Sequence, residues 1–398
     1  MSETGKPETG KPETGKSGPG LLDGLVVLDL SQFLAGPLAA LRLGDLGARV
    51  IKVERPGAGD LCRGIYLDAE EVGGDSTLFH AINRDKEGIA LDFKAPSDLA
   101  RLHALAARAD VVIQNFRPGV AARLGLDDAA LRRRNPGLVC GSITGYGDAG
   151  PWMDRPGQDL LAQARSGLMW LSGDAQQGPV PVGLAVADML AGHTLVQGIL
   201  AALVRRFRTG AGASVETSLL EVLVDLQFEV LTTHLNDGGR MPHRGEFRSA
   251  HAYLAAPYGA YPTEDGFLAL AMMPLPRLAA LIDLPALADL AAEPGAEFTR
   301  RDAAKRLIAA QLATRPTAAW LAILEPADVW CAEVLDWPAL LRSEGFRALD
   351  MLQSVRRPDG TSLRTTRIPL RVDGVRRSGQ RAAPALGADT ATVLEALT

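Results

Sequence analysis

Two neighbouring features of this sequence could carry chemistry. Gly145, Gly147 and Gly150 form a G-x-G-x-x-G pattern directly after an apolar run, and the carboxylate of Asp159 follows nine positions after the last of these glycines. Such a glycine pattern binds the pyrophosphate of a dinucleotide when a helix begins at its third glycine. A single carboxylate can instead act as a covalent nucleophile. The two features therefore predict different reactions.

The residues after the glycine pattern argue against a dinucleotide site. Gly150 is followed by Pro151 and soon afterwards by Pro156, so the loop continues before a helix can begin. The segment "LSGDAQQGPVPVG" then stands where a dinucleotide site needs a strand with an acidic end. We interpret the glycines as turn residues that let the backbone pass close to a ligand.

Asp159 has an ordinary structural interpretation as well as a catalytic one. It comes at the start of a helix expected over residues 158–171, after Pro156 and Gly157. An acidic side chain in a first helical turn commonly caps the helix or interacts with its dipole. Spacing alone therefore does not separate a capping carboxylate from a nucleophile.

The composition limits the partners. The 398 residues are 47% hydrophobic and 22% charged with a net charge of -5, which favours neither a nucleic acid nor a membrane surface. Cys62, Cys140 and Cys331 lie far apart, which predicts neither a disulfide framework nor a metal cluster and fits the cytoplasm. The apolar stretch 185–204 carries Asp188 and other polar residues, so we expect a core helix. Small molecules are the expected partners.

The elements that must position these residues alternate between strand and helix. Short apolar strands buried on both faces predict an α/β fold, with a parallel sheet covered by helices on both sides, that is, a doubly wound Rossmann-like large domain over 21–235. A smaller α+β domain is expected over 236–325, and 326–398 returns to the large domain. Residues 1–20 repeat ETGKP and predict a disordered leader. The expected strands of the large domain are 24–30, 49–54, 88–93, 110–116, 138–144 and 213–218.

Several segments in order resemble one family. They are "LDLSQFLAGPLAALRLGDLGARVIKVERPGAGD", "INRDKEGIALD", "QNFRPGVAARLGL", "GYGDAGP", "RPGQDLLAQARSGLM", "PYGAYPTEDGFLALAM", "ADVWCAEVLDWPAL" and "APALGADTATVLEAL". Together they resemble the class III CoA-transferases, which include formyl-CoA, carnitine and succinyl-CoA transferases and also α-methylacyl-CoA racemase. The resemblance implies an interlocked, ring-like homodimer whose active sites lie between the large domain of one chain and the small domain of the other.

The resemblance also implies a reaction. Asp159 matches the nucleophile that takes CoA from an acyl-CoA and passes it to a carboxylic acid, through an aspartyl anhydride and an aspartyl-CoA thioester. CoA is part of the substrate, and no tightly bound cofactor or metal is expected. Expelling a thiolate with a carboxylate is uphill by roughly 6 kcal/mol, so oxyanion donors are needed. The turn at Gly147 and the pair Gly238 and Gly239 are the candidates, and Arg244 could face the acceptor carboxylate.

The same resemblance suggests the CoA contacts. Three cations match the family's phosphate-binding positions, and residues at the ends of strands match positions near pantetheine or adenine. The cations are Arg55, Lys86 and Arg123; the other residues are Phe33, Leu34, Ala35, Asn115, Phe116 and Tyr146.

Two other functions stay open at this point. The racemase branch pairs its Asp with an upstream His for proton transfer at the acyl α-carbon. No histidine lies between His103 and Asp159 here, and His103 comes too early in the chain, which favours CoA transfer. The other alternative is a non-catalytic acyl-CoA-binding protein of the same fold.

Overall fold

A parallel sheet forms the centre of the largest unit. The computed structural model describes residues 20–65, 67, 71–247, 250–357 and 359–397, so residues 1–19 of the expected leader lie outside the described part. The sheet has six strands in the order β5-β2-β1-β6-β7-β8, and every pair is parallel. This confirms the predicted mixed α/β fold with a parallel central sheet. The strands are β1 (Val26–Asp29), β2 (Arg49–Glu54), β5 (Glu87–Ala90), β6 (Val111–Gln114), β7 (Val139–Thr144) and β8 (Ala213–Ser218).

Helices cover both faces of this sheet because successive strand residues point to opposite sides. In β1, Val27 faces a core shared with α1 (Ala35–Asp45), α7 (Val186–Thr209) and α8 (Leu219–Leu226). Its neighbour Leu28 faces the other core. The helices of that second core are α3 (Pro96–Arg108), α5 (Asp128–Arg134) and α17 (Thr390–Glu395); α2 (Thr77–Asn83) and α4 (Val120–Leu124) lie in connections between strands.

Two helices end earlier than the sequence pattern predicts. The helix expected over residues 158–171 is α6 (Asp159–Ser166), because Gly167 adopts a left-handed conformation with φ of 86° and a short 3-10 turn follows. The apolar periodicity over 219–235 predicts one helix, but the structure divides this segment into α8 and α9 (Phe228–Asn236) at Gln227. Apolar periodicity runs through both breaks, so it does not reveal them.

A smaller unit contains a three-stranded antiparallel sheet and five helices among its described residues. The sheet order is β11-β10-β9, so its third strand, at Cys331–Glu333, lies beyond the boundary at residue 325 that the sequence suggested. Leu268 and Trp320 are completely buried in its core. The elements are β9 (Gly259–Pro262), β10 (Phe267–Leu270), β11 (Cys331–Glu333), α10 (Leu275–Leu281), α11 (Pro285–Ala291), α12 (Ala296–Thr299), α13 (Arg301–Leu312) and α14 (Thr317–Leu324).

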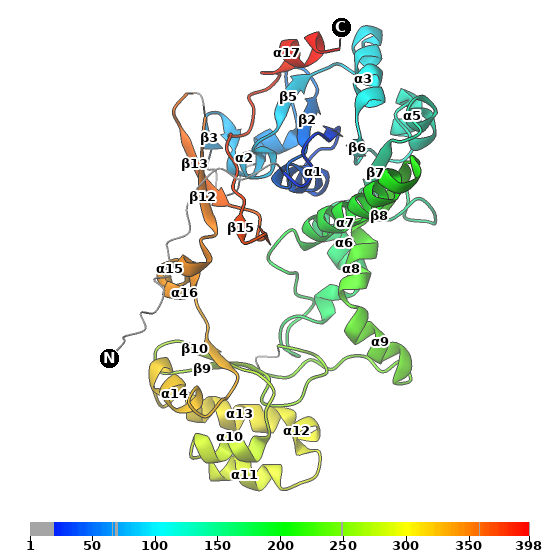
Figure 1. The fold of residues 1–398 in the computed structure, drawn as a ribbon. Helices are drawn as coiled ribbons and strands as arrows, with labels where there is room; N and C mark the ends of the chain where they lie inside the picture. Colours follow the sequence, from blue (N-terminus) through cyan, green and yellow to red (C-terminus); the bar gives the residue numbers. More distant parts are fainter. Residues whose placement is uncertain (1–19, 66, 68–70, 248–249, 358, 398) are drawn as a thin grey trace, which may run out of the picture.

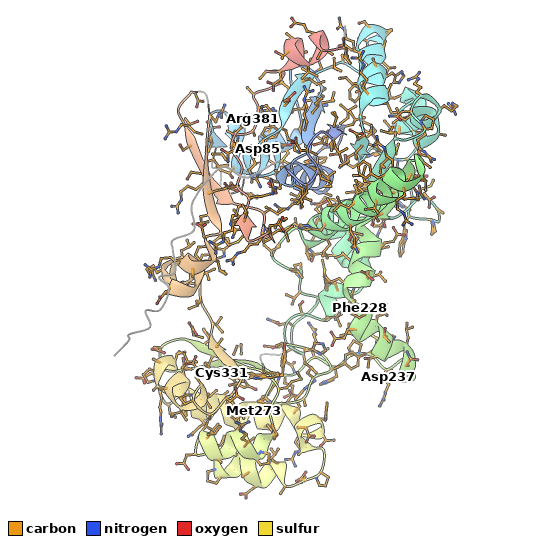
Figure 2. The ribbon with its side chains drawn as sticks, viewed as in Figure 1. Asp85, Phe228, Asp237, Met273, Cys331 and Arg381 are labelled. Carbon is orange, nitrogen blue, oxygen red and sulfur yellow. The ribbon has the colours of Figure 1, made fainter. Side chains whose placement is uncertain are left out.

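The C-terminal segment runs back to the large unit. The backbone N–H of Arg381 donates to Asp85, and the N–H groups of Gly88 and Ala90 donate to side chains of the segment before and in α17 (Figure 2). The two units are therefore joined on two sides, and the ribbon has the outline of a ring (Figure 1). Along this return lie α15 (Trp337–Arg342), α16 (Glu344–Leu349), β12 (Leu352–Arg356), β13 (Ser362–Thr366), β14 (Arg371–Val372) and β15 (Val375–Arg376); the hairpin of β3 (Glu71–Val72) and β4 (Asp75–Ser76) lies in the large unit.

One helix of the described residues, α7, is long and apolar enough by composition to cross a membrane. The bent pair α13 and α14 meets the same criterion only when taken together. In the structure α7 packs against α1, α8 and the β7 and β8 strands. It is a helix of the large unit's core, as its polar residues suggested.

A buried charge network lies beneath the carboxyl ends of β1 and β2. Lys52 in β2 has no exposed surface, and its ammonium lies 2.8 Å from the Asp60 carboxylate and donates to the Ser31 carbonyl at 2.6 Å. Asp60 in turn accepts a hydrogen bond from the backbone N–H of Phe33. The network therefore fixes the loop between β1 and α1.

We predict that Lys52→Met lowers the free energy of unfolding by about 3–5 kcal/mol, because it leaves the buried Asp60 carboxylate without its cation. A urea titration followed by circular dichroism measures this. The matched control is Arg49→Met, which removes a cation whose side chain is 46% exposed from its pair with Glu87 and should cost about 1 kcal/mol or less. Equal losses for the two variants would contradict the account.

Candidate active site

The glycine pattern and Asp159 belong to one loop that begins and ends at the same place, after β7. Gly145, at the end of β7, lies directly against Gly157, so that a Cβ on Gly145 would come within 2.6 Å of the Gly157 Cα. The backbone thus leaves the sheet at Gly145, makes a loop, and returns to the same place two residues before Asp159. The glycines serve a close contact between backbone segments rather than a phosphate.

Side chains close the loop between these two glycines. The Tyr146 hydroxyl donates to the Pro156 carbonyl, and the ring of Tyr146 packs edge-on against Trp152. The guanidinium of Arg165, on α6, lies over both rings. The N–H of Gly147, a predicted oxyanion donor, instead donates to the Thr144 hydroxyl at 2.9 Å.

Asp159, the first residue of α6, is buried against the start of α7. Its Oδ1 accepts hydrogen bonds from the backbone N–H groups of Ala187 at 2.7 Å and Asp188 at 3.2 Å, and its Oδ2 accepts one from the Gln163 side chain at 2.7 Å. The N-cap residue of α7, Ala185, has no side chain that could cap the helix. Asp159, in the first turn of α6, supplies that cap from another element, so it caps α7 and not its own helix.

A second carboxylate stands beside the first. Asp188 lies in the first turn of α7, and burial together with the negative charge of Asp159 raises the pKa of Asp188 to about 7. Two carboxyl groups this close in a buried place disfavour the doubly ionised state. Near neutral pH, the Asp188 carboxyl is therefore divided between its neutral and charged forms.

Phe33 and Asn115, two of the predicted CoA residues, lie where the strand order reverses, between β1 and β6. Parallel sheets bind ligands at the carboxyl ends of the strands at such a point. Gln32 and Asn115 join the two strand ends, since the Asn115 side chain accepts from the Gln32 N–H at 2.9 Å and donates to its carbonyl at 2.7 Å. Phe33 is 45% exposed and has a φ of 65°, rare for a residue with a side chain.

The start of α1 connects this crevice to the Asp159 site. Gly192, in the second turn of α7, lies so close to α1 that a Cβ on it would come within 2.8 Å of the Ala35 carbonyl oxygen. Ala35 thus lies against the same end of α7 that Asp159 caps, whereas Leu34 packs against the cluster that contains Cys62 and Phe79. The structure brings together the predicted nucleophile and one wall of the predicted CoA site.

The three predicted phosphate-binding cations differ in placement. Arg55 and Arg123 are exposed, after β2 and in α4. Lys86 is 2% exposed, and its ammonium donates to Asp29, Asn83 and the Pro37 carbonyl, while burial lowers its pKa to about 8 against the opposing charge of Asp29. All three ammonium protons are used inside the protein, so Lys86 does not present its charge to a phosphate. Of the remaining predicted residues, Phe116 packs edge-on against Phe93 in the second core.

The residues predicted in the small unit differ in placement within the single chain. Arg244 is buried against the segment between α6 and α7, and its guanidinium donates to the carbonyls of Ser172, Gln177 and Gly178. Gly238 and Gly239 follow Asp237, which lies at the outer end of α9, away from α6 (Figures 1 and 2). Within one chain, neither glycine is brought to Asp159.

Sequence reasoning missed all three groups that hold the Asp159 carboxylate, which are the Gln163 side chain and the backbone amides of Ala187 and Asp188. Gln163 is 1% exposed and lies one helical turn after Asp159, so its i,i+4 spacing on α6 was the signal that could have found it. The Ala187 amide had no such signal, because a backbone N–H has no sequence identity. Only the fold shows which helix end it occupies.

Comparison with known proteins settles the family. Residues 22–390 match the family described as CoA-transferase family III. The chain is 32% identical over 388 residues to the succinate–glutarate CoA-transferase of Agrobacterium fabrum, which covers 94% of this chain and 95% of that protein. The chain belongs to CoA-transferase family III.

Other members are equally similar. The chain is 35% identical over 326 residues to the acetyl-CoA:oxalate CoA-transferase of Acetobacter aceti. This match covers 80% of this chain and 81% of that protein. The crystal structure of a CaiB/BaiF family protein from Brucella suis superimposes with a TM-score of 0.83 at 31% identity, over 96% of this chain and 100% of that chain. The chain is thus an enzyme of the class III CoA-transferase family, whose substrates are CoA thioesters.

The contact between the two loop glycines yields one prediction. Gly145→Ala should lower kcat on the order of 100-fold, because the added methyl group pushes Gly157 and with it Asp159 out of position. Steady-state CoA transfer measures this, and a thermal melt checks that the variant is folded. Gly178→Ala is the control, since a Cβ there meets no atom within 4 Å. A folded Gly145→Ala variant with wild-type kcat would refute this role for the glycine.

The second carboxylate yields a prediction about pH. A carboxyl group whose pKa is raised on folding stabilises the protein fully below its unfolded value, here 3.8, and that contribution is lost as the pH rises through about 7. Asp188→Asn should therefore reduce the fall in melting temperature between about pH 4 and pH 7. Melting curves across this range, with the exposed Asp225→Asn as control, provide the measurement. An unchanged slope in Asp188→Asn would show that Asp188 does not titrate there.

Proposed function

We propose that the protein moves CoA from an acyl-CoA to a carboxylic acid with Asp159 as the covalent nucleophile. The observation that carries this proposal is a buried carboxylate whose two oxygens are both held by hydrogen bonds, at the helix end that also packs against the start of α1. Fixed orientation of this kind favours attack, since a well-placed reactant saves several kcal/mol of the barrier. The residue type and its family position agree with that geometry.

The reaction proceeds through two kinds of intermediate. The Asp159 carboxylate attacks the thioester and forms a mixed anhydride, and the released CoA thiolate then attacks the aspartyl carbonyl to form an aspartyl-CoA thioester. The acceptor carboxylate attacks that thioester, and the thiolate takes the acceptor acyl group from the second anhydride. The burial of Asp159, which is 6% exposed, supports this route because anhydrides must be kept from water.

The proposed CoA site is the crevice between β1 and β6. In this proposal the doubly wound, Rossmann-like arrangement of the large unit supplies the crevice, Arg55 and Arg123 bind phosphates, and Phe33 and Asn115 lie along the pantetheine or adenine. Lys86 acts beneath the site, where it neutralises Asp29. Two dicarboxylate transferases among the relatives, for succinate–glutarate and acetyl-CoA:oxalate, support a carboxylic acid acceptor.

We propose further that the enzyme works as an interlocked homodimer. The ring outline of the chain supports this, and so do large apolar side chains that the single chain leaves exposed on α6, on α9 and on either side of β11. Gly238 and Gly239 would then cover the site of the other copy. The exposed residues are Leu160, Leu161, Phe228, Trp330 and Trp337.

Three free cysteines agree with a cytoplasmic location.

The contacts of His103 argue against the racemase alternative. His103 lies on α3, which packs on the opposite face of the sheet from α7, and its ring is hydrogen-bonded to the Leu124 carbonyl. It is a structural histidine. His103 therefore does not supply the second base that a two-base proton transfer with Asp159 would need.

Asp159→Asn tests the proposal. Turnover should fall at least about 10⁴-fold, because an amide cannot form the anhydride, while the dissociation constant for acyl-CoA changes by less than about threefold. Steady-state kinetics and isothermal titration calorimetry give the two values. The matched control is the exposed Asp148→Asn, in the same loop. Full turnover by a verified Asp159→Asn preparation would exclude the covalent route.

A further inference from the structure

The two oxygens of Asp159 have different surroundings. Oδ1 accepts hydrogen bonds from two backbone amides in the first turn of α7, whereas Oδ2 accepts a single one, from Gln163. Since a carboxylate oxygen has two lone pairs, both lone pairs of Oδ1 are engaged and one of Oδ2 is free. Rotation of the carboxylate by half a turn would exchange the two oxygens, and on the way it would break all three hydrogen bonds inside a buried site. The catalytic role of each oxygen rests on the proposed function.

We propose that the enzyme keeps these two oxygens distinct through every catalytic cycle. Oδ2 is the nucleophile, and Oδ1 is the permanent carbonyl oxygen, which lies in an oxyanion hole made by the N–H groups of Ala187 and Asp188. The start of a 24-residue helix adds the partial positive charge of its dipole at this place. The oxyanion hole is therefore part of the support that holds the nucleophile.

Each step of the cycle forms one bond and breaks another. A lone pair of Oδ2 bonds to the thioester carbonyl carbon, and the carbon–sulfur bond breaks with its electron pair on the CoA sulfur. The thiolate then bonds to Cγ of Asp159, and the Cγ–Oδ2 bond breaks, so the donor acid leaves with Oδ2. An oxygen of the acceptor carboxylate next bonds to Cγ and expels the thiolate. Finally the thiolate bonds to the acceptor carbonyl carbon and the bond from that carbon to the bridging oxygen breaks, so the acceptor's oxygen stays on Asp159 in the Oδ2 place.

Negative charge develops on Oδ1 whenever Cγ is attacked. This happens twice in each cycle, once with the thiolate and once with the acceptor carboxylate as the attacking group. Donors placed where an oxyanion forms typically contribute 10²–10³-fold to a rate. The amides of Ala187 and Asp188 already lie at hydrogen-bond distance from that oxygen before the reaction begins, so no reorganisation of the protein is needed.

Gln163 is the positioning residue in this arrangement. Its Oε1 accepts from the Val182 N–H at 2.9 Å, and its Nε2 also lies 3.3 Å from the Leu184 carbonyl. These contacts fix the side-chain amide so that its NH₂ group, not its oxygen, meets Asp159. These contacts also tie the segment before α7 to α6. The Gln163 side chain therefore positions both the Asp159 carboxylate and the segment that leads into α7.

Isotope exchange into Asp159 tests the proposal. The wild-type enzyme turns over many times with an unlabelled acyl-CoA and an acceptor acid carrying heavy oxygen at both carboxylate positions, succinyl-CoA and glutarate being the first pair to try. The peptide containing Asp159 is then analysed by mass spectrometry. We expect a single heavy oxygen, because only the Oδ2 place is exchanged. Two heavy oxygens in the wild type would overturn the proposal, and no label in an enzyme that turns over would overturn the covalent mechanism itself.

Gln163→Leu tests whether the Gln163 side chain prevents rotation of the Asp159 carboxylate. This variant should lose on the order of 10-fold to 100-fold in kcat with little change in KM and should acquire two heavy oxygens, because the carboxylate can rotate. Gln227→Leu is the matched control: this buried glutamine donates to the Ser166 and Leu223 carbonyls without touching Asp159, and its variant should keep a single heavy oxygen. A single heavy oxygen in Gln163→Leu would remove Gln163 from the proposal.

Discussion

The hydrogen bonds between Asp159 and the first turn of α7 are the interaction on which the rest of the site depends. They join α6, which carries the carboxylate, to the long helix that packs against both the sheet and α1. An uncapped helix end and a buried carboxylate are each unfavourable alone, since each leaves polar groups without partners. Together they satisfy each other. The chemistry proposed for Asp159 uses the same contacts, so stability and catalysis are not separate demands here.

The CoA side of the site rests on a second constraint, the buried charges beneath β1 and β2. Lys52 and Asp60 hold the backbone of the loop before α1, and this includes the left-handed conformation of Phe33. A strained backbone persists only where its surroundings determine it. The loop in turn sets the start of α1, which touches α7 at Gly192. A continuous set of contacts therefore connects the floor of the crevice to the nucleophile.

Much of the fold could be predicted from the sequence, and less of the site. Strands such as Arg49–Glu54 and Ala213–Ser218 are predicted at their observed bounds because their β-branched residues and turn signals are local. The helix break at Gln227 was missed, since it interrupts no apolar pattern. Asp159 was identified by resemblance, whereas its hydrogen-bond partners on α7 depend on tertiary packing. For Lys86 the resemblance suggested a phosphate ligand, but its contacts show a buried ion pair with Asp29.

The proposed chemistry depends throughout on a covalent bond to Asp159. The direct measurement is to incubate the wild-type protein with an acyl-CoA, add hydroxylamine, and map the modified residue by mass spectrometry. The covalent mechanism predicts a hydroxamate on Asp159 that requires the acyl-CoA and is prevented by adding excess acceptor acid before the hydroxylamine. A protein that transfers CoA at full rate without any modification of Asp159, or with the hydroxamate on another carboxylate, would contradict it.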